Sequence, residues 1–331
     1  MMNQCSFFLF NTANTVSADV DDTVLDEVTR LCARYELTFS RFNPASELYR
    51  LNHSTADAVP VSSELADALT AALRYCKATD GLFDITMGSV LKLWNFHTGT
   101  MPCESDLAAA CEHVNWQSIS VEYRASDSAD QPPATWVRRT DSKTVIDLGG
   151  IAKGYIADRI IDLLRSRGAA HALVNLGGNV AVMGGKENRV PWKIGLRRPV
   201  STSDASLNER PAATQILNAV RPFAAVSLRN GSAVTSGTYE RAFVKDGRLY
   251  HHILDPKTGM PAETDLQSVS VISERSIDGD GYTTALIAMG AQRALSFCEV
   301  LPGIEAVGVT TAGEIVKTSG IGTKVPFEQL A

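Results

Sequence analysis

The sequence predicts an α+β fold, and two observations carry that prediction. Segments with the pattern of strands cluster together, and segments with helical spacing separate them irregularly rather than in a regular βαβ repeat. The chain has 331 residues, of which 44% are hydrophobic, so it can bury a core in one large domain or two smaller ones. With 31 basic and 37 acidic side chains, the chain is mildly acidic, which argues against a nucleic-acid-binding surface.

The first half of the chain predicts strands at the N-terminus and then helices separated by turns. Apolar residues at every third or fourth position mark two of the helices, and a serine precedes two helix starts. In chain order, the elements are a strand or hairpin at 5–18, a helix at 21–36, a turn-rich segment at 38–52, a helix that follows Ser62, an extended stretch at 80–86 and a short helix capped by Ser105.

The second half predicts more strands, with two helices between them. Two polar stretches that contain proline are expected to be surface loops, at 124–135 and 200–214. In chain order, the remaining elements are a strand that ends at Asp147, a helix at 151–167, a strand pair at 171–185, strands at 192–199, 224–228, 242–250 and 267–273, and a helix at 280–299.

The composition also bears on the compartment. No stretch approaches the roughly 20 apolar residues of a membrane helix, and the N-terminus lacks the basic region of a signal peptide. The six cysteines are scattered without C-x-x-C spacing, which is typical of free thiols in a reducing compartment. We therefore expect a cytoplasmic protein without membrane insertion.

The segment DLGGIAKG places Asp147, Gly149, Gly150 and Lys153 between a strand and the start of a helix. Glycines let the backbone approach a ligand closely, and a helix start offers N–H groups to an anion. Lys153 suits a phosphate, and Asp147 suits a sugar hydroxyl or a ring N–H. A plain glycine turn in which Asp147 pairs with Lys153 is the alternative.

The segment TSGTYER (235–241) places hydroxyls and a glycine before a strand with Glu240 and Arg241. Thr235, Ser236 and the amide of Gly237 suit a phosphate or a ring carbonyl, and a plain turn is the alternative.

The segment HHILDPKTG (251–259) ends a strand with two histidines, followed by a turn signature. Neighbouring strand residues point to opposite faces, so only one of the two histidines can face a given site. Histidine titrates near neutrality and suits a general base, whereas an ordinary exposed pair is the alternative.

The segment DGDGYTTA (278–285) places Asp280 and Thr284 four residues apart at an expected helix start, so they share one face. A carboxylate and a hydroxyl on one face suit a hard cation such as Mg²⁺, with further ligands from backbone, water or substrate phosphate. Ordinary capping of the helix by Asp280 is the alternative.

Eight segments in their order along the chain resemble the FAD:protein FMN transferase family, the ApbE-type flavin transferases. The resemblance runs from about residue 5 to the end and implies a single domain over 1–331, built of two interleaved α+β subdomains with a flavin cleft between them. The segments are FSRFNPASELYRLN, DGLFDITMGSVLKLWNF, DLGGIAKGYIADRI, VNLGGNV, WKIGLRRP, TSGTYERAF, HHILDPKTGMP and SVSVI with DGDGYTTALIAMG.

The resemblance implies Mg²⁺-dependent transfer of FMN from FAD to a threonine hydroxyl of a client flavoprotein, with a phosphoester formed and AMP released. It implies His252 as the catalytic base. The implied FAD contacts are Phe39, Leu82, Phe83, Asp84, Asp147, Lys153, Ser236, Gly237, Arg241 and Ile253. The implied metal ligands are the Gly150 carbonyl, Asp280, Thr284 and Thr283.

Two other functions fit the same segments. An FAD pyrophosphatase that gives free FMN and AMP would use the same metal and pyrophosphate contacts, with water in place of the threonine. A non-catalytic FAD-binding protein would need neither a base nor a metal, so His252, Asp280 and Thr284 argue against it.

Overall fold

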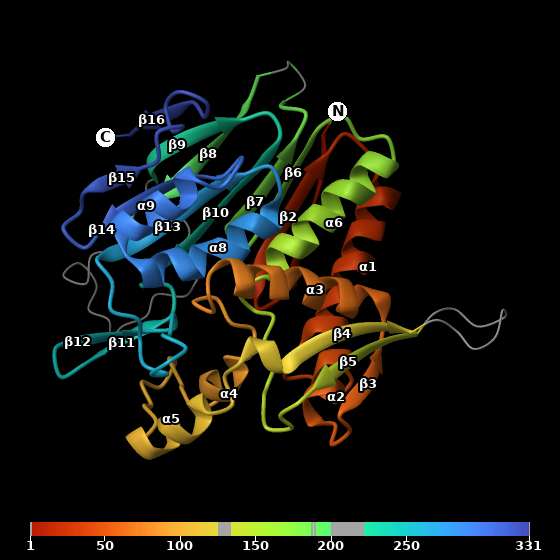
Figure 1. The fold of residues 1–331 in the computed structure, drawn as a ribbon. Coiled ribbons are helices and arrows are strands. Elements are labelled where there is room, and N and C mark those ends of the chain that lie inside the picture. The colour runs from red at the N-terminus through yellow and green to blue at the C-terminus, as the bar shows by residue number, and fades with distance from the viewer. Residues whose placement is uncertain (1, 125–133, 187, 189, 200–221, 331) are drawn as a thin grey trace.

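An antiparallel sheet of eight strands forms the centre of the computed structural model, which describes residues 2–124, 134–186, 188, 190–199 and 222–330 (Figure 1). All neighbouring strands of this sheet run antiparallel. This arrangement confirms the α+β prediction. The strands, in their order across the sheet, are β1 (Asn3–Leu9), β2 (Thr12–Ala18), β6 (Ala172–Leu176), β7 (Asn179–Met183), β10 (Gly231–Gly237), β13 (Leu266–Ser273), β14 (Glu305–Thr310) and β15 (Ile315–Lys317).

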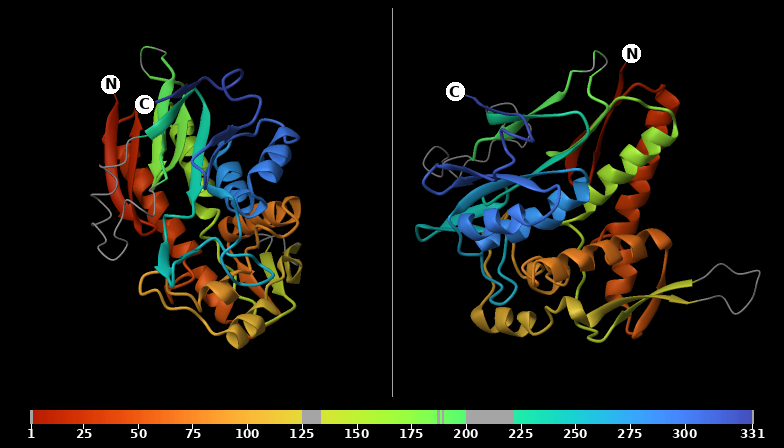
Figure 2. Two further views of the ribbon diagram at one scale, coloured as in Figure 1. Left: turned by 90° about the vertical axis from the view of Figure 1, so that its left-hand side faces the viewer. Right: turned by 45° about the horizontal axis from the view of Figure 1, so that its top comes forward.

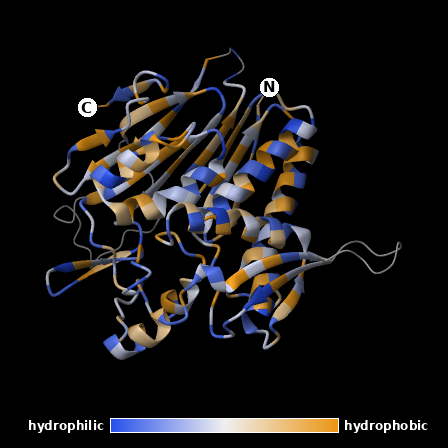
Figure 3. Ribbon diagram, viewed as in Figure 1, coloured by the Kyte–Doolittle hydropathy of each residue, from blue (hydrophilic) through white to orange (hydrophobic). Residues whose placement is uncertain are grey.

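Four helices pack on one face of this sheet (Figures 1 and 2). α6 presents an apolar stripe that includes Ile156, Ile160 and Leu164, which are fully buried, whereas α8 is buried on most sides. The colouring of Figure 3 shows the polar residues of α1 and α6 interspersed with these apolar ones. The four helices are α1 (Asp22–Phe39), α6 (Ala152–Ser166), α8 (Ser276–Met289) and α9 (Ala291–Glu299).

A small sheet packs on the opposite face and completes a second core. Its strands contribute Ile194, Phe223 and Val226, which pack with residues of β7, β10, β13 and β14. The small sheet has the order β16 (Phe327–Gln329), β9 (Pro222–Leu228) and β8 (Trp192–Arg197).

The remaining elements form the end of the molecule that lies away from both termini (Figure 2). They include a three-stranded sheet, a hairpin and several short helices. These are α2 (Glu47–His53), β3 (Ala58–Val61), α3 (Ser63–Ala78), α4 (Gly88–Leu91), α5 (Glu104–Cys111), the 3₁₀ turn Trp116–Ser118, β4 (Ile119–Arg124), β5 (Ala134–Arg139), β11 (Ala242–Lys245) and β12 (Arg248–His251).

Two predicted elements of the C-terminal half are wrong in their extent, and glycine explains both. The helix expected over 280–299 begins at Ser276 and breaks at Gly290, whose φ of 76° cannot continue a helix, so α8 and α9 are separate. The strand expected over 242–250 is a hairpin that turns at Asp246 and Gly247, both with positive φ. β10 was not predicted, and the TSG residues end this strand instead of preceding one.

Smaller differences occur earlier in the chain. The turn-rich segment 38–52 contains most of α2, and the stretch expected to be extended at 80–86 is a series of turns. The helix expected to be capped by Ser105 begins at Glu104, and Cys103 is its N-cap. At 124–135, Arg124 ends β4 and Ala134 begins β5; residues 125–133, like the predicted loop 200–214, lie outside the described residues.

Candidate functional site

The DLGGIAKG segment leads from the core to the N-terminus of α6. The carboxylate of Asp147 accepts a hydrogen bond from the Gly149 N–H at 2.6 Å and pairs with the Arg41 guanidinium. The partner of Asp147 is therefore Arg41 and not Lys153, the partner in the plain-turn alternative. Lys153 lies in the first turn of α6, whose N-cap is Ile151, a residue without a side-chain oxygen.

Asp280 supplies the cap that α6 lacks. Its carboxylate accepts the Gly154 N–H at 2.6 Å through one oxygen and the Asn179 side-chain amide at 3.1 Å through the other. Only 6% of Asp280 is exposed, and the N-terminus of α6 provides a partial positive charge there. The alternative that Asp280 caps its own helix is wrong, because α8 begins four residues earlier and its N-cap is Arg275.

The two helices cap each other. Asp158 of α6 accepts the N–H groups of Ser276 and Ile277 at 2.8 and 3.2 Å, which satisfies the N-terminus of α8. Such exchange needs close packing, and a Cβ at Gly154 would lie 2.5 Å from the Ser276 carbonyl oxygen. Glycine at this position therefore fixes Asp280 against the start of α6.

Thr284 follows Asp280 by one helical turn and lies beside the glycine turn. A Cβ built on Gly150 would lie 4.0 Å from the Thr284 hydroxyl and 3.1 Å from the Phe83 ring. The structure thus brings together Gly150, Thr284 and Phe83. Their contacts with a metal ion or FAD stay predictions. Thr283 points elsewhere: it is 1% exposed, and its hydroxyl accepts a hydrogen bond from Ser236 at 2.8 Å, which joins α8 to β10.

The donors around Asp280 fit a hard cation. Across the described residues, no group of three or more His, Cys, Asp or Glu side chains is arranged so that it could hold a metal ion by itself. The group consists of one carboxylate, threonine hydroxyls and a backbone carbonyl, all of which are oxygen donors that Mg²⁺ prefers. With so few protein ligands, the remaining positions of a bound ion would fall to water and phosphate.

His252 directly follows β12, and its surroundings keep the imidazole neutral. Burial, the charge of Arg241 and the neighbouring His251 lower its pKa to about 3. Its Nδ1 is buried and has no hydrogen-bond partner among the described residues. The two histidines differ as predicted: His251 is 5% exposed, whereas His252 is half-buried, so His252 is the one that a ligand can reach.

We expect the free energy of unfolding to fall as the pH drops from about 7 towards 4. The unfolded chain binds protons on both histidines near pH 6.5, but burial lowers the folded-state pKa of His251, and that of His252 is about 3. Between pH 3 and 6.5 the unfolded state binds more protons, so stability rises with pH there and is lost on acidification.

Urea denaturation at about pH 7, 5.5 and 4.5 measures this dependence. His252→Gln should flatten part of the slope, whereas His53→Gln, which changes an exposed histidine of α2, should not. An unchanged slope in His252→Gln would contradict the expectation.

Glu240, an exposed residue in the turn between β10 and β11, lies within electrostatic range of three cations. Burial and the charge of Asp280 raise the pKa of the Glu240 carboxyl, and the charges of Lys153, Arg241 and Arg197 oppose that rise. Solvent still reaches the Glu240 side chain and screens these charges. Six residues interact electrostatically in this region, and we name them the charged cluster: Lys153, Arg197, Glu240, Arg241, His252 and Asp280.

Several residues that were predicted to contact FAD are engaged in packing or hydrogen bonds within the protein. The Phe39 ring packs on Tyr35 and Tyr155 in the core, and Ile253 is also a core residue. The carboxylate of Asp84 accepts three hydrogen bonds, two from Thr86 and one from the Trp116 N–H, so it fastens the loop that bears Leu82 and Phe83. FAD contacts of Phe39, Leu82, Asp84 and Ile253 stay predictions.

The position of Gly237 favours glycine because the Tyr239 ring, two residues further along, packs closely against it. A Cβ at this position would lie 2.4 Å from the Tyr239 ring, so no larger residue fits at the end of β10. Ser236, beside it, is held by its hydrogen bond to Thr283. Contacts of Ser236 and Gly237 with FAD stay predictions.

Three residues at the site were not singled out from the sequence, namely Arg41, Asn179 and Arg197. Arg41 pairs with Asp147, Asn179 holds Asp280 and accepts from the Ser276 hydroxyl at 2.6 Å, and Arg197 lies near Gly178. All three lie in segments that carry the family resemblance. In the sequence, each of the three is a polar residue next to a turn or a strand end. That position alone does not reveal which residue its side chain contacts.

The fold and the site define an α+β protein in which a helix N-terminus, a buried carboxylate and three cations meet. That arrangement suits phosphate oxygens together with a hard divalent cation. The chain belongs to the ApbE family, whose sequence profile matches residues 10–308.

Named relatives and a solved structure agree with this membership. The chain is 33% identical over 312 residues to the FAD:protein FMN transferase of Treponema pallidum (strain Nichols), covering 91% of this chain and 81% of the relative. It is 32% identical to that of Klebsiella pneumoniae (strain 342), covering 90% and 86%. The crystal structure of the ApbE protein from Thermotoga maritima superposes with a TM-score of 0.80 at 27% identity, covering 96% of this chain and 97% of that one.

Proposed function

We propose that this chain is an FAD:protein FMN transferase that uses Mg²⁺ and attaches FMN through a phosphoester to a threonine of a client flavoprotein. Membership of the ApbE family and the names of the two relatives support the reaction class. The observation that carries the proposal to this site is Asp280, a buried carboxylate held against the N-terminus of α6, with Thr284 one helical turn further along α8. Lys153, Arg197 and Arg241 act electrostatically on Glu240, as Asp280 does. Residues 1–331 act as one domain in this proposal.

The cations and the helix start bind the pyrophosphate of FAD. Lys153, Arg197 and Arg241 offset the negative charge of the two phosphates, and the partial positive charge at the N-terminus of α6 adds to this attraction. The proposed flavin and adenosine contacts come from the flanking segments. They are Phe39, Leu82, Phe83, Asp84, Asp147, Ser236, Gly237 and Ile253.

A bound Mg²⁺ would supply charge stabilisation to the pyrophosphate oxygens. Asp280, Thr284 and the carbonyl of Gly150 would hold it, whereas Thr283, which the sequence also suggested as a ligand, is engaged with Ser236 instead. Asn179 and the Gly154 N–H keep the Asp280 carboxylate oriented, because each occupies one of its oxygens and leaves the other lone pairs available.

His252 accepts the proton of the client threonine. Its low pKa keeps the imidazole neutral at physiological pH, so one ring nitrogen is free to act as an acceptor. The threonine oxygen forms a bond to the FMN phosphorus, the P–O bond to AMP breaks, and AMP leaves. Arg241, whose charge acts on His252, would stabilise the charge that develops on the leaving phosphate.

The test is mass spectrometry of an acceptor domain after incubation with this protein, FAD and Mg²⁺. A mass gain equal to an FMN phosphoester, lost in the presence of EDTA, is the expected result. Free FMN and AMP with an unmodified acceptor would indicate the pyrophosphatase, and intact FAD would indicate a binding protein; either outcome overturns the proposal.

The client lies in the cytoplasm in this proposal. All six cysteines are free thiols, which is typical of a reducing compartment. In the part of the chain that the structure describes, no helix has the length and apolar character to cross a membrane.

A further inference from the structure

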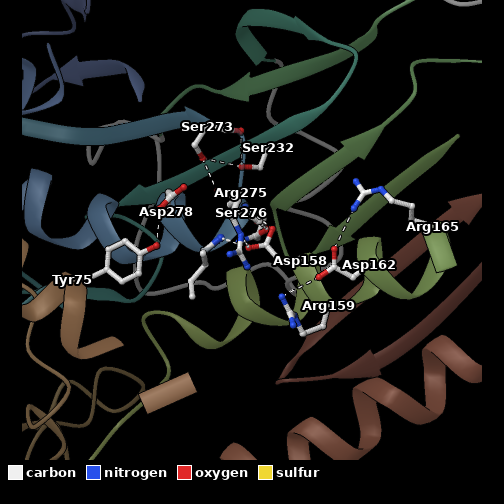
Figure 4. Close-up of polar contacts among 12 residues, drawn as sticks. Tyr75, Asp158, Arg159, Asp162, Arg165, Ser232, Ser273, Arg275, Ser276 and Asp278 are labelled. Atoms are coloured by element: carbon white, nitrogen blue, oxygen red, sulfur yellow. Dashed lines mark hydrogen bonds and ion pairs between the residues drawn. The ribbon is translucent and has the colours of Figure 1, made fainter. Parts of the chain in front are cut away.

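A second polar pocket lies on the outer side of the helix layer, between α3, α6 and α8. Its volume is about 530 Å³, within the range of small-molecule sites. Three arginines line it, one from α3, one from α6 and one from the start of α8: Arg74, Arg159 and Arg275. Figure 4 labels four of the lining residues, Tyr75, Arg159, Arg275 and Asp278.

The pocket is separate from the charged cluster although both use α8. Asp278 and Tyr282 line the pocket, whereas Asp280 and Thr284 belong to the proposed metal site. The two pairs are offset by two residues, which is about 200° around a helix. One helix therefore separates the two sites and contributes side chains to both.

The arginines of the pocket retain donors for a ligand. Arg159 pairs with Asp162 and Arg275 with Asp158, each through part of its guanidinium, and Arg74 forms no ion pair with any described residue. The Nε of Arg159 is buried and has no hydrogen-bond partner in the described part of the chain. Guanidinium groups with unused N–H donors suit phosphate oxygens.

A buried hydroxyl gives a second, independent indication. The Oγ1 of Thr70 on α3 is buried, lines the same pocket and has no hydrogen-bond partner among the described residues. Buried polar groups of native proteins are normally hydrogen-bonded. Two residues of one pocket, Thr70 and Arg159, thus each carry a buried polar atom without a hydrogen-bond partner among the described residues, as expected where a polar ligand completes the contacts.

The remaining residues that line the pocket indicate which groups the ligand carries besides a phosphate. The half-buried ring of Tyr282 offers apolar surface for a planar ring, and the mostly buried rings of Tyr75 and Tyr155 line the pocket beside it. The carboxylates of Asp67 and Asp278 accept hydrogen bonds and so suit sugar hydroxyls; Asp278 already accepts one from the Tyr75 hydroxyl at 2.6 Å.

We propose that this arginine pocket binds a nucleoside monophosphate, with the phosphate at Arg74, Arg159 and Thr70 and the base against the tyrosine rings. Binding at this pocket is independent of transfer activity. The ligand contacts α8 on the side opposite Asp280, so it holds in place the helix that bears the proposed metal ligands.

Equilibrium dialysis of labelled AMP tests the proposal, with saturating FAD and EDTA present to occupy the FAD site and prevent turnover. We expect AMP to bind under these conditions and adenosine, which lacks the phosphate, not to compete. Arg74→Ala and Arg159→Ala should each weaken AMP binding about tenfold or more. Arg165→Ala is the matched control, because Arg165 also lies on α6 and pairs with Asp162 but does not line the pocket.

Thr70→Val keeps the test independent of folding. Valine has the shape of threonine, and the Thr70 hydroxyl has no partner to lose, so the variant should keep its melting temperature and FAD affinity while AMP binding weakens. AMP binding that disappears once FAD saturates the protein, or that survives both arginine substitutions, would overturn the proposal.

Discussion

Asp280→Ala is expected to abolish FMN transfer, with a loss of about 10³-fold or more at normal Mg²⁺. Asp280 is the one carboxylate among the proposed metal ligands, and it also holds the Gly154 N–H and the Asn179 amide. Its removal leaves a buried N–H unpaired, so the free energy of unfolding should drop by about 1–3 kcal/mol as well. Transfer is measured by mass gain of the acceptor, and stability by urea denaturation.

Two further variants separate chemistry from stability at this position. Asp280→Asn keeps an oxygen that can accept the Gly154 N–H but removes the charge, so it should fold and still lose transfer. Asp158→Ala removes the reciprocal cap on α8 and should cost a similar free energy of unfolding while it retains most of the transfer. Equal loss of transfer in Asp158→Ala and Asp280→Asn would make Asp280 a structural residue.

His252→Ala is expected to lower kcat about 10²–10⁴-fold and to leave FAD affinity within a few-fold. The neutral imidazole acts on the incoming hydroxyl, a contact that bound FAD alone does not make. The rate should also show no inflection near pH 6.5 from this residue, because the folded-state pKa of His252 is about 3. Single-turnover transfer and quenching of flavin fluorescence measure the two quantities separately.

His252→Gln distinguishes a base from a positioning residue. Glutamine can form hydrogen bonds but cannot take the proton, so it should be as slow as the alanine variant if His252 is the base. Recovery of transfer in His252→Gln, or a parallel loss of FAD affinity in both variants, would assign His252 to binding.

The sequence predicted those parts of the fold that depend on local patterns. Helical spacing predicted α1, α3 and α6, and the absence of a regular βαβ repeat predicted the antiparallel α+β arrangement. It missed several strands, β10 and β14 among them, and misplaced the start of α8. The strand expected to end at Asp147 is also wrong, because β5 already ends at Arg139. A strand buried on both faces lacks alternation, and DGDG reads as a turn rather than a helix interior. Packing explains the latter: a Cβ at Gly279 or Gly281 would overlap Val234 or Tyr75.

In the candidate site, too, local sequence patterns predicted some features and tertiary packing decided the others. By itself, the sequence determined the residue types and their order: Gly150 and Lys153 at a helix start, Asp280 and Thr284 on one helix face, and a histidine pair of which one member is accessible. Only the tertiary structure decided that Asp280 caps α6 instead of α8, that Arg41 pairs with Asp147, and that Arg197 joins the charged cluster. The physical reason is that a capping or charged side chain pairs with the donor that lies nearest in space. Gly154 and Asp280 are 126 positions apart in the chain, so they meet only when their helices pack.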